Sequence, residues 1–518
     1  MPPERRRLLA LMLKERGIAA APKQTIPRRR EAASFLPLAL NQEGLWFIEQ
    51  LDPGKANYNI PGTVRLQGRL HRAAMEQSLS EIVRRHEVLR TTFGVNEEGA
   101  PIQKIAAAAP LQLPLLDLQT LPPEPRENEA RRLATAAAQR PFDLAAGPLF
   151  RAQLLQLGAD DHALLFNMHH LVADGWSMGI FTREFSALYQ AFCRGEASPL
   201  PELPIQYADF ARWERDRMRG DKLEATLAYW RQQLAGSTLM LVLPTDYPRP
   251  RVQSFRGMHQ PIRLPKTLTA AIRQLARQEG VTVFMVMLAA FKILLHRYSG
   301  QDDIVVGSTF ANRNLRELEN LIGFFVNTLP LRTKLSGDPD FREMLRRVRE
   351  ATFGAAAHQE LPLAKLVQDL QPVRDPGRNP IYQVVFDLLT PDHNPAVYGY
   401  GLSSAVMERL QLADLSVTPM DIEGGIARFD IAVFIWDLPE GLSGTFEFSA
   451  DLFTAATVAR LVEQFQILLE VVVAAPDLKL SALVERLEAA EQQQQISQEK
   501  ALKDFAGQKL KNMKRRPI

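Results

Sequence analysis

The sequence predicts an α/β protein with more than one packing unit, and three observations support this prediction. The chain has 518 residues, more than one ordinary hydrophobic core organises. Segments with helical spacing of apolar residues alternate with short apolar runs typical of strands. The alternation occurs twice, on either side of the segment 244–265, which holds five prolines. We therefore expect two α/β halves, with the chain crossing between them in this proline-rich segment.

The first half is predicted to contain two helices, strands and the loop that holds the candidate site. Apolar residues three or four positions apart predict helices over 71–86 and 181–192. A short apolar run predicts a strand over 162–168, and the Ala-, Leu- and Pro-rich segment 105–125 predicts a strand with a long loop. A strand, a loop and a helix thus follow in order, and the loop holds His169 to Trp176.

The second half repeats the pattern, and the two ends of the chain differ from both halves. Helices are predicted over 268–276 and 284–295, and strands over 304–310, 330–333, 431–436 and 444–448. We expect the halves to span 35–245 and 246–480. Residues 1–34, with a short helix over 4–16, are predicted to be a helical and basic linker or docking segment, and residues 481–518 a polar and basic linker.

The composition is that of a globular protein, with 46% hydrophobic and 23% charged residues and a net charge of +3. Such a balance gives no general attraction for nucleic acid, so no nucleic-acid partner is expected, and the basic runs near both ends are interpreted as solvated linker charge. Cys193 is the single cysteine, which excludes an intrachain disulfide and a cysteine metal cluster.

No segment has the features of a membrane anchor or a secretion signal. The apolar run 8–13 is short, is interrupted at Lys14 and lacks a small-residue cleavage pattern. The longest apolar stretch, Val281–Leu295, is too short to span a bilayer and is predicted to be a buried helix. We therefore expect a cytoplasmic protein with no membrane partner.

The run HHLVADGWS, residues 169–177, carries the chemistry. Adjacent strand residues point to opposite faces, so only one histidine faces a given pocket and the two do not share a metal ion; no metal site is expected. Gly175 lets a substrate approach the backbone, and the following helix offers N–H groups to a developing oxyanion. A near-neutral histidine accepts a proton from an attacking amine or holds that amine by a hydrogen bond.

The residues around this loop favour direct attack of one substrate on another. No serine or cysteine nucleophile stands out near the histidines. From the residues alone, a pair of ordinary hydrogen-bonding histidines stays the alternative.

Six further segments, in family order with this loop, resemble the motifs of nonribosomal peptide synthetase condensation domains, which belong to the chloramphenicol acetyltransferase-like superfamily. The HHxxxDG motif at 169–175 is shared across that superfamily and by itself is weak. The seven segments are LNQEGLWFIEQL (40–51), RHEVLRTTF (85–93), MHHLVADGWS (168–177), YADFARW (207–213), IGFFVNTLPLR (322–332), HQELPLAKLV (358–367) and RNPIYQVVF (378–386). Together they make the resemblance specific over most of the chain.

The resemblance implies a fold and a reaction. The fold is two chloramphenicol acetyltransferase-like lobes forming a V-shaped pseudo-dimer, with a tunnel between them. The reaction is amide bond formation between an acyl or peptidyl donor thioester and an aminoacyl acceptor, each bound to a carrier protein. Phosphopantetheine is supplied by the partner carrier proteins, and no cofactor is expected on this chain. The terminal segments are expected to meet neighbouring synthetase modules.

The resemblance also assigns roles to the loop. His170 matches the active-site histidine, as general base or as the group that positions the acceptor amine. His169 and Gly175 are grouped with it as catalytic candidates, although His169 is expected to orient the loop and Gly175 to allow close backbone approach. Asp174 is expected to be a structural anchor paired with Arg313.

Further residues receive supporting roles. Asn312, in the segment ANR before that arginine, departs from the family's Gly-Arg pair and puts the pairing in doubt. Trp176, Ser177 and Asn327 are expected near the tunnel or the substrate, and Arg85 is expected to brace the first lobe.

Several subtypes remain open. The histidines and the Gly-Trp-Ser that follows favour an L-donor condensation domain or a starter domain that attaches a fatty acyl group. Because Met1 opens the chain without an upstream carrier domain, the donor is expected from another polypeptide or as an acyl-CoA. An ester-forming domain, an acyl-CoA-dependent acyltransferase of the HHxxxDG superfamily and a catalytically silent platform that recruits carrier proteins are the alternatives.

Overall fold

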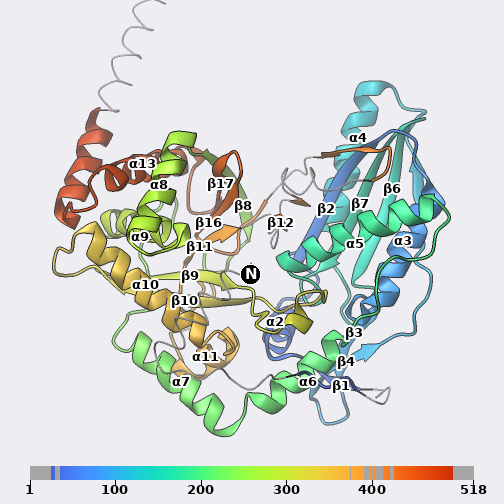
Figure 1. Ribbon diagram of the computed structural model, residues 1–518, viewed down its shortest axis with the longest axis horizontal. Coiled ribbons are helices and arrows are strands. Elements are labelled where there is room, and N and C mark those ends of the chain that lie inside the picture. The colour runs from blue at the N-terminus through green and yellow to red at the C-terminus, as the bar shows by residue number, and fades with distance from the viewer. Residues whose placement is uncertain are drawn as a thin grey trace, which may run out of the picture.

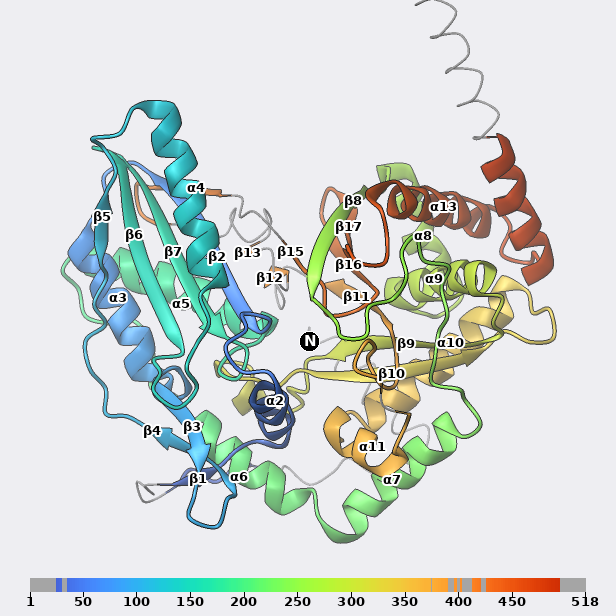
Figure 2. The same cartoon turned by 180° about the vertical axis from the view of Figure 1, so that it is seen from behind.

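The computed structural model describes residues 25–29, 35–373, 375–389, 396–397, 401–402, 412–420 and 425–493. These residues form two lobes that lie side by side and meet at one end, around α2 (Leu40–Leu51), α6 (Tyr207–Arg217) and α7 (Gly220–Leu234) (Figures 1 and 2). Both lobes mix sheets with helices, so the predicted α/β class is confirmed. The predicted helix over 4–16 and the basic end of the chain lie outside the described residues.

The first lobe is built on a five-stranded sheet with helices on both faces. The strand order is β14 (Ser416–Pro419), β2 (Asn59–Gln67), β7 (Asp161–His169), β6 (Phe150–Gly158) and β5 (Leu115–Asp117). Alternate strand residues point to opposite faces. One face packs on α3 (Arg72–Arg85) and α5 (Gly175–Cys193), and the other packs on the alanine-lined side of α4 (Pro123–Gln139).

A small antiparallel sheet closes the lower end of this lobe. It consists of β1 (Leu36–Pro37), β4 (Pro101–Ile105) and β3 (Thr91–Val95), which follows the short 3-10 helix η1 (Glu87–Arg90). Because β14 comes from the C-terminal half of the sequence and pairs with β2, the chain returns to the first lobe late.

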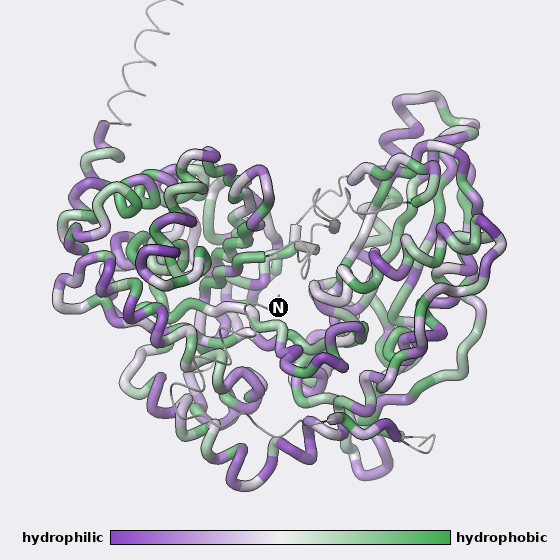
Figure 3. The backbone as a smooth tube through the Cα atoms, viewed as in Figure 1, coloured by the Kyte–Doolittle hydropathy of each residue, from purple (hydrophilic) through white to green (hydrophobic). Residues whose placement is uncertain are grey.

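The second lobe is built on a seven-stranded mixed sheet. The strand order is β10 (Asn327–Lys334), β9 (Asp303–Phe310), β11 (Val384–Leu389), β16 (Ile431–Leu438), β17 (Gly441–Ser449), β8 (Arg256–Arg263) and β15 (Gly425–Ile426). Its outer face is covered by α8 (Lys266–Gln278), α9 (Val283–Ser299), α10 (Phe341–Ala357) and α13 (Ala455–Ala474), while α11 (Leu363–Leu370) lies near α2 and α7 (Figure 1). Apolar strands run through the middle of each lobe, and polar residues lie mostly on the outer turns (Figure 3).

The register of β17 separates its two faces. Phe446 and Phe448 belong to the core that the helices cover. Glu447 alternates with them and therefore points to the opposite face, which is turned toward the first lobe (Figure 2). The same alternation places Ala432 of β16 and His259 of β8 beside Glu447.

Most predicted elements appear in the structure, with one difference in the segment between the halves. The helices over 71–86, 181–192, 268–276 and 284–295 correspond to α3, α5, α8 and α9, and every predicted strand of the second half is present. The proline-rich segment 244–265 is not a plain crossover, because it contains β8, whose Pro261 pairs with Thr445. The lobes are instead bridged by α6 and α7, which lie along their shared end (Figure 1).

The predicted limits of the two domains, 35–245 and 246–480, stay predictions. The chain passes from the first hydrophobic core to the second between Ala211 and Leu227, earlier than residue 245, although the segments 318–325 and 412–415 return to the first core. Residues 480–493 are helical, and Leu483 and Leu487 are fully buried in the second core. The segment 481–518, predicted to be a linker, therefore begins as part of the second lobe, because its leucines follow helical spacing.

Candidate active site

The two histidines at the end of β7 have different surroundings. The Nδ1 atom of His169 accepts the Leu171 N–H at 3.1 Å, which leaves the ring hydrogen on Nε2. That Nε2 lies 3.8 Å from a carboxylate oxygen of Glu49, and the ring meets the edge of Phe142 at a centroid distance of 5.9 Å. His169 thus fixes the turn that follows β7; its catalytic role stays a prediction.

His170 is buried, with 5% of its surface exposed, and lies on the other side of the turn. Its backbone N–H donates to the carbonyl of Tyr58 at 2.8 Å, and its ring meets Phe324 at a centroid distance of 4.9 Å. Burial, reinforced by the positive charge of Arg428, lowers the pKa of His170 to about 3. The imidazole is therefore neutral at physiological pH and presents a lone pair to a partner.

Asp174 and Arg313 lie against each other, as the sequence predicted. The Arg313 Nη2 is 3.2 Å from an oxygen of Asp174, and the two side chains are 1% and 2% exposed. Asp174 also accepts the N–H groups of Ser177 at 2.8 Å and of Phe325 at 3.0 Å. Through these contacts Asp174 joins α5 to the segment 318–325; its role as a structural anchor stays a prediction.

Arg313 makes further contacts besides the one with Asp174. Its Nη1 donates to the carbonyls of Leu318 at 2.5 Å and Leu321 at 2.6 Å, and its guanidinium lies 4.0 Å from the centre of the Phe325 ring. Burial lowers the pKa of Arg313, against the raising effect of Asp174.

The departure of Asn312 from the family pattern has a conformational explanation. Asn312 has a φ of 49°, in the left-handed region. Glycine adopts this region without cost, and asparagine tolerates it better than other residues with a Cβ. Asparagine therefore preserves the turn that aims Arg313 at Asp174.

The start of α5 is occupied by protein groups. Asp174 is the N-cap residue of α5, and Gly175 is the first helical residue. The Ser177 hydroxyl is 2.7 Å from Asp174, accepts the Gly323 N–H at 3.0 Å and contacts Arg313 at 3.2 Å. Because the Asp174 carboxylate takes the Ser177 N–H and complements the helix dipole, the expected oxyanion site at this helix end loses one of its donors.

The residues predicted near the substrate are engaged with protein groups in the structure. Ser177 is fully buried, and its hydroxyl uses its hydrogen and both lone pairs on protein. The Trp176 ring N–H donates to the Glu319 carbonyl at 3.0 Å. The Asn327 side chain joins the start of β10 to the segment before α11 through the carbonyls of Gln359 and Leu361, at 2.9 and 2.6 Å. Their proximity to a substrate stays a prediction.

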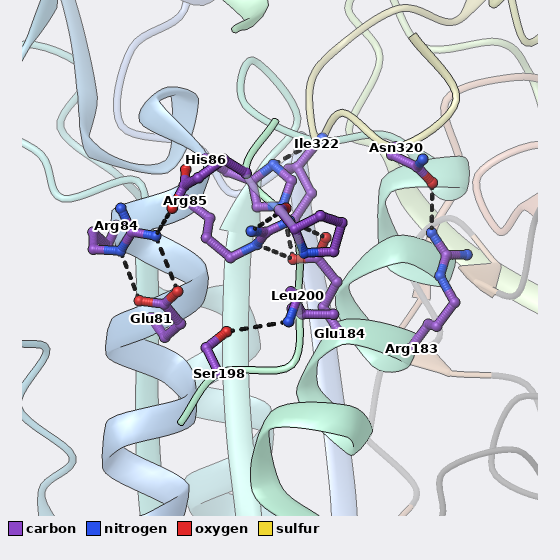
Figure 4. Close-up of polar contacts among 12 residues, drawn as sticks. Glu81, Arg84, Arg85, His86, Arg183, Glu184, Ser198, Leu200, Asn320 and Ile322 are labelled. Carbon is purple, nitrogen blue, oxygen red and sulfur yellow. Dashed lines mark hydrogen bonds and ion pairs between the residues drawn. The ribbon is translucent and has the colours of Figure 1, made fainter. Parts of the chain in front are cut away.

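A buried charge cluster behind the site was only partly expected (Figure 4). Arg85, predicted to brace the first lobe, donates to Glu184 at 3.2 Å, and the Nε2 of His86 lies 2.9 Å from the same carboxylate. The Nδ1 of His86 accepts the N–H of Ile322 at 3.3 Å. The cluster therefore ties α3 and α5 to the segment that also binds Asp174 and Arg313.

One group near His170, the guanidinium of Arg428, was not foreseen from the sequence. It comes from the second lobe, between β15 and β16, and donates to the carbonyl of Asn57 at 2.9 and 2.7 Å. No local pattern signals this contact, because the two residues are 371 positions apart.

Neither a group of metal ligands nor a single membrane-spanning helix occurs among the described residues. Across the part of the chain that the structure describes, no group of three or more histidine, cysteine, aspartate or glutamate side chains is placed to hold a metal ion. Within that same part, no individual helix has the length and apolar character of a membrane span; α8 and α9 meet those criteria only as a pair bent by 105°.

Comparison with known proteins identifies the family. The family model named Condensation domain matches residues 32–496. The chain belongs to the condensation domain family. Domains of this family in nonribosomal peptide synthetases form amide bonds, so the chain is an enzyme domain of the acyltransferase type.

Curated relatives of this condensation domain are much longer proteins. One linear gramicidin synthase polypeptide of Brevibacillus parabrevis is 43% identical over 479 residues, which cover 92% of this chain and 6% of that protein. Phosphinothricin tripeptide synthetase PhsC of Streptomyces viridochromogenes is 38% identical over 488 residues, which cover 92% of this chain and 44% of that protein. The chain thus spans less than half the length of these relatives.

Solved structures share the fold of the condensation domain. The X-domain from teicoplanin biosynthesis, in a complex with OxyB, matches with a TM-score of 0.78 and 28% identity over 90% of this chain and 99% of that one. The first condensation domain of the calcium-dependent antibiotic synthetase matches with a TM-score of 0.68 and 23% identity, over 86% and 98% of the two chains. The fold predicted from the motifs is therefore confirmed, whereas the V shape and the tunnel stay predictions.

Proposed function

We propose that this condensation domain joins an acyl or peptidyl donor thioester to an aminoacyl acceptor, both carried on the phosphopantetheine arms of partner carrier proteins. The observation that supports this most is the neutral, buried His170, held by its backbone at the end of β7 beside an intact Asp174–Arg313 anchor. The relatives that contain the matching segment are synthases of gramicidin and of phosphinothricin tripeptide.

His170 acts in this proposal by holding the acceptor amine. The amine nitrogen attacks the thioester carbonyl, the new C–N bond forms, the C–S bond breaks, and the thiolate leaves with the proton that the amine loses. A histidine whose pKa is about 3 is a weak base. It is therefore better suited to accept a hydrogen bond from the amine N–H than to remove the proton as a general base. Such a bond strengthens as positive charge develops on the attacking nitrogen.

Asp174 contributes indirectly. It anchors α5 and the segment 318–325, and Phe324 of that segment contacts the His170 ring. The Asp174–Arg313 pair thereby holds Phe324 in place against the His170 imidazole. It orients that ring without touching the substrate.

An L-configured donor or a fatty acyl starter group, and an amide product, are the finer parts of the proposal. The relatives named as peptide synthases favour an amide over an ester. A cytoplasmic location stays a prediction.

The proposal is tested with two carrier proteins, one loaded with an acyl or peptidyl donor and one with an aminoacyl acceptor. The intact mass of the acceptor carrier is followed with the wild-type chain and with His170→Ala. We expect a mass gain equal to the donor group with the wild type, and a rate at least about 100-fold lower with the folded variant.

Other outcomes of this experiment would decide between the alternatives. Equal rates for the wild type and His170→Ala would refute the assigned site. Carrier binding without product, across L-donors and fatty acyl donors, would favour the silent recruitment platform, which is supported by the similarity to an X-domain that was solved in a complex with a second protein, OxyB. Product formed from an acyl-CoA without a donor carrier would favour a free acyl-CoA-dependent transferase.

A further inference from the structure

A second-lobe arginine reaches the backbone segment that holds His170. The Nε and Nη2 atoms of Arg428 donate to the Asn57 carbonyl at 2.9 and 2.7 Å, and the guanidinium lies 5.1 Å from the centre of the Tyr58 ring. The planar guanidinium offers two parallel N–H groups to one acceptor, a geometry that lysine does not reproduce.

The next peptide along the segment binds His170 itself. The Tyr58 carbonyl accepts the His170 N–H at 2.8 Å, and Asn59, which begins β2, pairs with His169 in the sheet. Two consecutive carbonyls thus accept hydrogen bonds, that of Asn57 from Arg428 and that of Tyr58 from His170. A displacement of this segment therefore moves the backbone of His170 with it.

Glu447 secures Arg428 in turn. Its carboxylate lies on the face of β17 turned toward the first lobe, is 3% exposed and accepts the backbone N–H of Arg428. Burial raises the pKa of Glu447 to about 8, although the charge and the N–H of Arg428 oppose the rise. The carboxylate thus fixes the main chain from which the guanidinium extends.

Arg428 also acts on His170 through its charge. After burial, the positive charge of Arg428 contributes most to the lowered pKa of His170; Asp174 raises that pKa, and His169 lowers it slightly. The other ring facing His170, Phe324, carries no charge.

We infer that Arg428 is a positioning residue, held by Glu447, that fixes the Asn57–Tyr58 segment across the two lobes and so fixes the backbone of His170. The catalytic part of this inference rests on the proposed function, whereas the positioning part concerns the chain alone.

Two substitutions separate the two effects of Arg428. Arg428→Lys keeps the charge and removes the paired hydrogen bonds, and Arg428→Gln removes both. Arg256→Gln is the matched control, because Arg256 lies on the same lobe with a side chain that is 75% exposed. Glu447→Gln tests the support, since it keeps the shape of the side chain and one acceptor oxygen but removes the ionisable group.

The positioning part is tested on the full chain without substrate. Hydrogen–deuterium exchange is measured for the amides of residues 57–59 and 170, and the titration of ¹⁵N-labelled His170, assigned with His170→Ala, is followed by NMR from pH 3 to 8. We expect exchange at these amides to rise about 10-fold or more in both Arg428 variants, less in Glu447→Gln, and not in the control. We expect the pKa of His170 to rise in Arg428→Gln only. Unchanged exchange and an unchanged titration in both Arg428 variants would overturn the inference.

The catalytic part is tested by single-turnover rates, taken as the ratio of variant to wild type so that ionisation of the acceptor amine cancels. We expect a ratio of about one-tenth at pH 7.5 for Arg428→Gln that falls further as the pH is lowered, and a ratio independent of pH for Arg428→Lys. A merely structural role would lower both ratios without this pH dependence. If the wild type forms no product but exchange and titration respond as expected, the proposed function fails and the positioning role stands.

Discussion

Replacing Asp174 by asparagine tests whether the acid of the HHxxxDG loop is an anchor or a catalyst. The carboxylate accepts hydrogen bonds from Ser177, Phe325 and Arg313, at 2.7 to 3.2 Å. Asp174→Asn keeps the size of the side chain and one acceptor oxygen, but it removes the negative charge and turns an NH2 group toward a guanidinium or a backbone N–H.

The expected loss of stability follows from these contacts. Removing one member of a buried ion pair costs about 3–5 kcal/mol. Asparagine caps a helix about as well as aspartate, so the N-cap bond to Ser177 adds little to the loss. Arg313 also keeps the carbonyls of Leu318 and Leu321. We therefore expect Asp174→Asn to lower the free energy of unfolding of the first lobe by about 3 kcal/mol.

The assay is urea denaturation of Asp174→Asn, Arg313→Met and the double variant, with product formation measured under conditions in which each variant is folded. We expect the double variant to be less destabilised than the sum of the single variants, by about 2 kcal/mol, because the second substitution removes the charge that the first leaves unpaired. Destabilisation below about 1 kcal/mol together with near-complete loss of product formation would refute the anchor role and place Asp174 in the chemistry.

Three further predictions concern the free energy of unfolding. Burial alone raises the pKa of Glu184, but His86 and Arg85 hold this pKa below its ordinary value, so the stability that Glu184 contributes is present above the unfolded pKa and lost in acid. In urea titrations, Glu184→Gln should lower the free energy of unfolding by about 3 kcal/mol at pH 7 and by less near pH 4. An equal loss at both pH values would contradict this prediction. Burial lowers the pKa of the fully buried Lys292 to about 7, so the wild-type protein gains stability as the pH rises from 7 toward 10.5, the pKa of an unfolded lysine. The free energy of unfolding of Lys292→Met, relative to the wild type, should therefore fall by about 1.4 kcal/mol per pH unit over that range. A constant difference would show that Lys292 stays charged. Asn312→Gly should be near neutral in thermal unfolding and Asn312→Ala should cost about 1 kcal/mol, whereas equal stability of the two would argue against the left-handed backbone.

Elements with a strong local pattern were predictable, and elements with a weak one were not. The apolar spacing in α3 and α5 is visible in the sequence because each helix buries one continuous face. Helix α4 was missed although Ala130, Ala134 and Ala138 are buried four residues apart, since alanine alone gives little contrast with its polar neighbours. Strand β8 was hidden by its surrounding prolines; it pairs with β17 on one side and only briefly with the two-residue strand β15 on the other.

By itself the sequence determined the α/β class, the loop that carries His170 and, through seven ordered motifs, the resemblance to condensation domains, since each is encoded by residues close together in the chain. The tertiary structure alone decided how the groups around His170 meet. Asp174 and Arg313 are 139 positions apart, and Arg428 and Asn57 are 371 apart. Contacts over such separations leave no periodic trace in the sequence, because they depend on how the two lobes pack and not on the local conformation of either segment.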